Sequence, residues 1–101
     1  SLEDCILIVR TLLYKAKRIL KLQILNNEAK NVDQIISNFK PPIFWKDKEI
    51  VKRQIINWDA IEIENLIYKI NDIEFIVKNN ANNTLNIVSD FILNTSNNPN
   101  N

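Results

Sequence analysis

Apolar residues recur every three or four positions along most of the chain, which is the spacing of amphipathic helices. Residues 2–25 are expected to form one long helix that ends at Asn26-Asn27. Its buried stripe consists of apolar side chains at helical spacing: Leu2, Cys5, Ile6, Val9, Leu12, Leu13, Ala16, Ile19, Leu20 and Ile24. A short helix over residues 32–38 follows, with Asn31 as its N-cap and Gln34 completing a capping box.

Two consecutive prolines, Pro41 and Pro42, interrupt this helical pattern. Proline donates no N–H to a helix, and it pushes the preceding residue toward extended geometry. The chain is therefore expected to run extended up to Trp45. Three large apolar side chains follow the prolines and are predicted to be buried as a plug in the bundle: Ile43, Phe44 and Trp45.

Two further helices are predicted on either side of Trp58, which closes the first of them and packs. Residues 46–57 place four apolar side chains on the buried side: Ile50, Val51, Ile55 and Ile56. Asp59 and Glu62 have the spacing of a capping box for a helix over residues 60–78. The buried stripe of this helix is strongly periodic: Ile63, Leu66, Ile67, Ile70, Ile73 and Val77.

Glu74 precedes Lys78 by one helical turn, in the order that favours an ion pair worth about 0.2–0.5 kcal/mol. Glu74 also lies beside the buried stripe of its helix. For that reason its carboxylate is also in position to reach a basic group on the first helix.

A last helix begins at Asn83 or Thr84, after a turn of asparagines. It is apolar around much of its circumference: Leu85, Ile87, Val88, Phe91, Ile92 and Leu93. Because this is more apolar surface than one core contact requires, part of it is expected to face a partner. The candidate interface residues are two from this helix and two that lie off the preceding stripe: Ile87, Phe91, Ile61 and Tyr68.

These patterns together predict an all-α protein, a compact bundle of about five helices in one domain over residues 1–94. Residues 95–101 are rich in Asn, Ser and Pro and are expected to be a disordered tail. The absence of Met leads us to expect an excised piece of a longer protein.

Composition sharpens this prediction mainly through what it excludes. The chain has no His and no Gly, so imidazole catalysis and glycine-rich phosphate loops are impossible. Its one cysteine, Cys5, rules out an internal disulfide and lies on the buried stripe. The net charge of +1 produces no strong field, and no apolar run approaches the roughly 20 residues of a membrane span. We expect a cytoplasmic protein with no membrane partner.

No group of residues has the pattern of a catalytic or cofactor site. Asp59, Glu62 and Glu64 are the one set that resembles a hard-metal cluster, but capping already accounts for the first two. We therefore expect no catalysis, no cofactor, no metal and no small-molecule substrate. A helix-turn-helix formed by residues 32–38 and 46–57 is disfavoured by the rigid connector around Pro41 and Pro42.

A basic face on the first helix supports an alternative function. Arg10, Lys17 and Lys21 are spaced to lie on one side of that helix. Together with Lys52 and Arg53 they would serve a small helical nucleic-acid-binding domain, whose affinity would fall steeply with salt.

Several segments resemble, in their order and spacing, the C-terminal domain of the delta subunit of bacterial DNA polymerase III. The resemblance covers about residues 2–94. An Asn replaces the glycine expected in the first turn, which the tolerance of Asn for left-handed geometry allows. The segments that carry it are the basic-aliphatic run at 12–22, Lys40-Pro41-Pro42-Ile43-Phe44-Trp45-Lys46, the junction from Gln54 to Trp58-Asp59, and Glu74-x-x-x-Lys78.

The resemblance implies a role in the clamp loader during DNA replication. In that family the C-terminal domain of delta joins the equivalent domains of delta-prime and gamma/tau in a pentameric collar. The collar supports loading of the sliding clamp onto primed DNA, and ATP hydrolysis belongs to gamma/tau. This chain would then be a non-catalytic assembly module of a DNA-directed DNA polymerase complex. It would meet the sliding clamp and primed DNA only through the full assembly.

Overall fold

The computed structural model describes residues 1–29, 31–80 and 83–96. These ranges contain five α-helices and one 3-10 turn, and no strand, so the predicted all-α bundle is confirmed. In chain order the elements are α1 (Leu2–Ala29), α2 (Val32–Asn38), the 3-10 turn η1 (Trp45–Asp47), α3 (Lys48–Asn57), α4 (Ala60–Asn79) and α5 (Thr84–Ser96).

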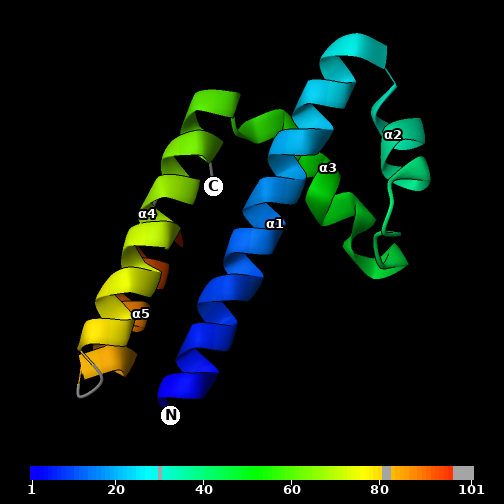
Figure 1. Ribbon diagram of the computed structural model, residues 1–101. Helices are drawn as coiled ribbons and strands as arrows, with labels where there is room; N and C mark the ends of the chain where they lie inside the picture. The colour runs from blue at the N-terminus through cyan, green and yellow to red at the C-terminus, as the bar shows by residue number, and fades with distance from the viewer. Residues whose placement is uncertain (30, 81–82, 97–101) are drawn as a thin grey trace.

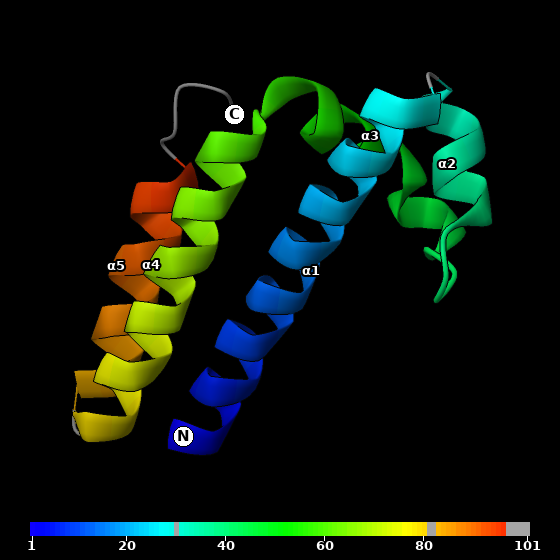
Figure 2. The same ribbon diagram turned by 45° about the horizontal axis from the view of Figure 1, so that its top comes forward.

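The helices form an elongated bundle around α1, measuring 46 × 26 × 19 Å (Figure 1). The first half of α1 lies beside α4 and α5, and α4 runs antiparallel to both (Figure 2). The second half of α1 packs against α2 and α3. α1 is therefore the one helix that both ends of the molecule share.

The buried residues form two hydrophobic clusters, and α1 contributes to each. One cluster joins α1 to α2, α3 and the start of α4: Ile19, Leu22, Ile36, Ile43, Val51, Ile55 and Ile63. The other joins α1 to α4 and α5: Cys5, Val9, Ala16, Ile70, Val77 and Val88. Ile67, which is half-buried, packs against both clusters and connects them. Cys5 is a core residue, as predicted.

The predicted N-caps Asn31 and Asp59 are present, but the capping box predicted at Asn31 is incomplete, because the Gln34 side chain makes no return bond to the Asn31 N–H. The backbone N–H of Gln34 donates to Asn31 Oδ1 at 3.1 Å, at the start of α2. At the start of α4 the capping box is complete, because the Glu62 N–H donates to Asp59 Oδ1 at 2.7 Å and the Asp59 N–H donates to Glu62 Oε1 at 3.1 Å. These carboxylates satisfy N–H groups that have no partner inside the helix.

Two predicted helix ends are wrong. α1 continues through Asn26 and Asn27 to Ala29, because asparagine weakens a helix only modestly and no Gly or Pro is present to end it. α5 includes Thr95 and Ser96, which were assigned to the tail. The rest of that predicted tail, residues 97–101, lies outside the described residues.

The predicted aromatic plug is also wrong, except for Ile43. Ile43 is 4% exposed, whereas Phe44 is 56% and Trp45 is 70% exposed. Side chains of an extended segment alternate in direction, so burying Ile43 turns Phe44 outward. Trp45 then enters a tight 3-10 turn, in which the Asp47 N–H donates to the Phe44 carbonyl at 2.8 Å. α3 consequently begins at Lys48, two residues later than predicted.

The predicted buried stripes of α1 and α3 are too wide. Val51 and Ile55, one turn apart, fill the inner face of α3, and Ile50 and Ile56 beside them are exposed. On α1, Ile24 is exposed, whereas Leu22 is fully buried although the stripe omitted it. A helix end that contacts neighbours on one side buries only a narrow row, and apolar residues a quarter-turn away stay in solvent.

The connector between α2 and α3 provides a test of these assignments. We expect Ile43→Ala to lower the free energy of unfolding by about 2–5 kcal/mol, since it empties a core position. Trp45→Ala, two residues away, should change it by less than about 0.5 kcal/mol because the side chain is exposed. Urea unfolding followed by circular dichroism measures both. Equal losses from the two variants would contradict the burial pattern.

Candidate protein-interaction surface

α4 presents large apolar side chains to solvent on the side away from the core. Three of them are about equally exposed: Ile61 at 70%, Tyr68 at 71% and Phe75 at 71%. Residues seven apart on a helix differ by only about 20° in direction, so these three form one row. A second row with the same spacing is buried on the opposite side of the helix: Ile63, Ile70 and Val77.

Two carboxylates lie within the exposed row. Glu64 and Asp72 are each one turn from Tyr68, on either side of it, and both are exposed. We call the surface formed by Ile61, Glu64, Tyr68, Asp72 and Phe75 the outer face of α4. It alternates apolar and acidic side chains along the helix.

The candidate interface residues fall into two groups. Ile61 and Tyr68 lie on the outer face of α4, exposed as predicted. Ile87 and Phe91 are half-buried and pack against the core cluster around Val88, so much of their surface already serves the fold. A role for any of them in an interface stays a prediction.

Phe75 was missed at the sequence level. The available signal was its spacing, since it lies seven residues after Tyr68 and fourteen after Ile61. An apolar residue that extends an off-stripe row is more informative than one that stands alone.

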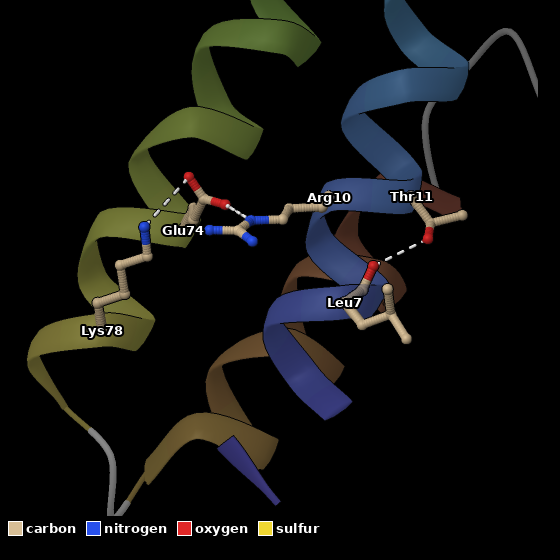
Figure 3. Close-up of polar contacts among 5 residues, drawn as sticks. All are labelled: Leu7, Arg10, Thr11, Glu74 and Lys78. Atoms are coloured by element: carbon tan, nitrogen blue, oxygen red, sulfur yellow. Dashed lines mark hydrogen bonds and ion pairs between the residues drawn. The ribbon is translucent and has the colours of Figure 1, made fainter. Parts of the chain in front are cut away.

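An ion-pair network joins α4 to α1 (Figure 3). Arg10 Nε donates to Glu74 Oε1 at 2.9 Å, and Lys78 Nζ lies 3.7 Å from Glu74 Oε2. Both predicted partners of Glu74 are therefore in place. The Arg10 hydrogen bond is the largest cause of a lowered pKa at Glu74; partial burial opposes the shift, and the positive charge of Lys78 adds to it.

The basic residues do not all remain available to a ligand. Arg10 is held by Glu74, and Lys52 Nζ lies 3.0 Å from Asp33 Oδ1 on α2. The hydrogen bond with Asp33 raises the pKa of Lys52. Three of the five predicted cations remain at exposed positions outside these pairs, on α1 and α3: Lys17, Lys21 and Arg53. The predicted basic face is therefore partly neutralised.

The connector between α2 and α3 forms a second exposed surface. The rings of Phe44 and Trp45 have centroids 6.0 Å apart and meet at 62°. Lys46 Nζ lies 5.4 Å from the centroid of the Trp45 ring, within the range of a cation–π contact. Pro41 and Pro42, which precede this pair, are exposed as well.

Trp58 packs at the edge of the hydrophobic core. It is half-buried and caps the C-terminus of α3, and Gln23 on α1 donates a hydrogen bond to its carbonyl. Its ring lines an apolar cleft of about 300 Å³ between α1, α4 and α5, together with Leu12, Ile19 and Phe91. The polar residues that line this cleft are Lys15, Gln54 and Thr95.

The described residues contain no group of three or more His, Cys, Asp or Glu side chains placed to hold a metal ion. Asp59 and Glu62, two members of the metal-cluster alternative, cap α4 instead. Among the helices described, none is both long and apolar enough to cross a membrane.

Comparisons with known proteins do not identify a relative: no family model, no curated protein and no solved structure matches this chain. Its function has to be argued from its own surfaces.

The Glu74 network predicts a pH-dependent stability. A lowered pKa means that folding favours the ionised carboxylate, so its contribution is complete at neutral pH and is lost as the pH falls below the ordinary value of 4.5. Glu74→Gln should lower the free energy of unfolding by about 0.5–1 kcal/mol at pH 7, and the difference from the unaltered chain should shrink toward zero in acid.

Denaturant unfolding across this pH range measures the effect, and Glu64→Gln on the solvent side of the same helix is the control. A Glu74→Gln deficit that stays constant from neutral to acid pH would show that the ion pair does not cause it.

Proposed function

We propose that this chain is a protein–protein assembly module, the collar domain of the delta subunit of a bacterial DNA polymerase III clamp loader. The observation that carries the proposal of an assembly module is the outer face of α4, where Ile61, Tyr68 and Phe75 are each about 70% exposed. Large apolar side chains exposed on one face of a protein often mark an interaction site, and aromatic residues are enriched in such sites. The resemblance of the sequence to the delta C-terminal domain supplies the particular assembly.

The shape of the bundle suits this role. The outer face of α4 and the Phe44–Trp45 pair belong to different elements, one on the long three-helix part and one on the connector beside α3. A domain in a closed ring needs separate contacts with its two neighbours. Two separate exposed surfaces on one bundle meet that requirement.

In this proposal the chain contributes binding and no catalysis. Its bundle would hold the collar together in the bacterial cytoplasm, while gamma/tau hydrolyse ATP and the N-terminal part of delta binds the clamp. The sliding clamp and primed DNA would be reached only through the whole complex. No cofactor, membrane or small-molecule substrate is required.

The test is to mix this chain with the C-terminal domains of gamma/tau and delta-prime from the same organism. Size-exclusion chromatography with light scattering should show co-elution as a complex whose mass equals the sum of its subunits. Each domain run alone separates this result from self-association. A helical, monodisperse chain that elutes separately from both partners would contradict the proposal.

Nucleic-acid contact is a second candidate, favoured by the exposed Phe44–Trp45 pair beside Lys46. Bases of single strands stack on exposed aromatic rings, and lysines nearby neutralise phosphates. If this function is correct, the chain alone should bind single-stranded DNA, with an affinity that falls steeply with salt. Trp45→Ala should weaken that binding, and Lys17→Ala measures the share of the basic face on α1. Binding that neither variant changes would exclude both surfaces.

A further inference from the structure

The outer face of α4 is long enough to receive a helix. Ile61 and Phe75 are fourteen residues apart, which corresponds to about 21 Å along the helix axis. α1 and α5 contact α4 on its other side, through the row that contains Ile70 and Val77. Nothing among the described residues covers the three exposed side chains.

The charges on this face have one sign. Glu64 and Asp72 are one turn before and one turn after Tyr68, so the central aromatic ring lies between two exposed carboxylates. Lys78 is engaged by Glu74, and Lys69 is about a quarter-turn from Tyr68, to the side of the row. A ligand seated on Tyr68 therefore meets an acidic residue on each side of it along the helix.

This pattern specifies the chemistry of the occupant. Burying the apolar row requires an apolar row of matching length, and an amphipathic helix supplies one. The two carboxylates favour lysine or arginine at the edges of that helix and disfavour acidic residues there. We infer that the outer face of α4 docks an amphipathic helix of another protein, whose apolar row is flanked by basic side chains.

This docking site names the chemistry expected of one neighbouring subunit in the proposed collar. It therefore deepens the proposed function and, in that respect, rests on it. Tyr68 is the expected centre of the contact, since it lies midway along the row with apolar and acidic residues on both sides. Central aromatic residues commonly account for most of the affinity of an interface. The carboxylates set orientation and salt dependence.

A pair of synthetic helices tests the charge preference directly. One peptide of about 20 residues carries an apolar row at seven-residue spacing flanked by lysines, and the matched peptide carries glutamates at the same positions. We expect the lysine peptide to bind the chain in a 1:1 ratio by fluorescence anisotropy, with at least about tenfold higher affinity than the glutamate peptide. Its affinity should fall as salt is raised.

Matched variants locate the site. Tyr68→Asn and Asp72→Lys should each weaken binding of the lysine peptide by at least about tenfold. Ile56→Asn on α3 replaces another exposed apolar side chain by Asn, and Asp90→Lys on α5 repeats the charge change at another exposed position; both should leave binding unchanged. Equal binding of both peptides, no binding, or equal losses in the controls would overturn the inference. So would self-association that Tyr68→Asn abolishes, because the occupant would then be a second copy.

The same variants separate this inference from the proposed function. If Tyr68→Asn co-elutes with the clamp-loader domains as well as the unaltered chain does, the docking site on α4 is wrong and the collar proposal stands. If the unaltered chain binds the lysine peptide at Tyr68 but neither clamp-loader domain, the collar proposal fails and the docking site stands.

Discussion

The fold depends on one helix face that serves two cores. α1 has 28 residues, about 42 Å of helix, in a molecule 46 Å long. Its buried side completes the α4–α5 core through Val9 and Ala16 and the α2–α3 core through Ile19 and Leu22. Neither pair of helices is large enough to bury a sufficient core alone. The continuity of α1 is therefore what makes the two halves one domain.

Because α1 occupies the inner sides of its partners, their outer sides determine what the molecule can bind. Each exposed surface is held by a buried residue close to it in the chain. Ile43 holds the connector that carries Phe44 and Trp45, and Ile70 fixes the rotation of α4 that turns Tyr68 outward. Surfaces held in this way lose little conformational freedom on binding, which favours affinity. The core thereby determines the geometry of the candidate interfaces.

Periodicity was sufficient to predict the helices and the caps, because both depend on local residues such as Asn31 and Asp59. It was not sufficient to predict how much of each helix is covered. Ile50 and Ile56 are as apolar as Ile55, and only the position of a neighbouring helix decides which of them is buried. Phe44 and Trp45 failed as core residues for a related reason: Phe44 turns outward by backbone alternation after Ile43, and Trp45 lies in the 3-10 turn that follows, whatever their hydrophobicity.

Part of the outer face of α4 could be predicted from the sequence, because its apolar residues are separate from the buried stripe of the helix. This helix has two apolar rows of the same period on opposite sides. The row of Ile63, Ile70 and Val77 is fully used by the fold, so folding does not explain the row of Ile61, Tyr68 and Phe75. Exposed large apolar residues add little to stability and increase the risk of aggregation, so a regular row of them requires another explanation. The surplus over what the core needs is the strongest functional signal in this chain.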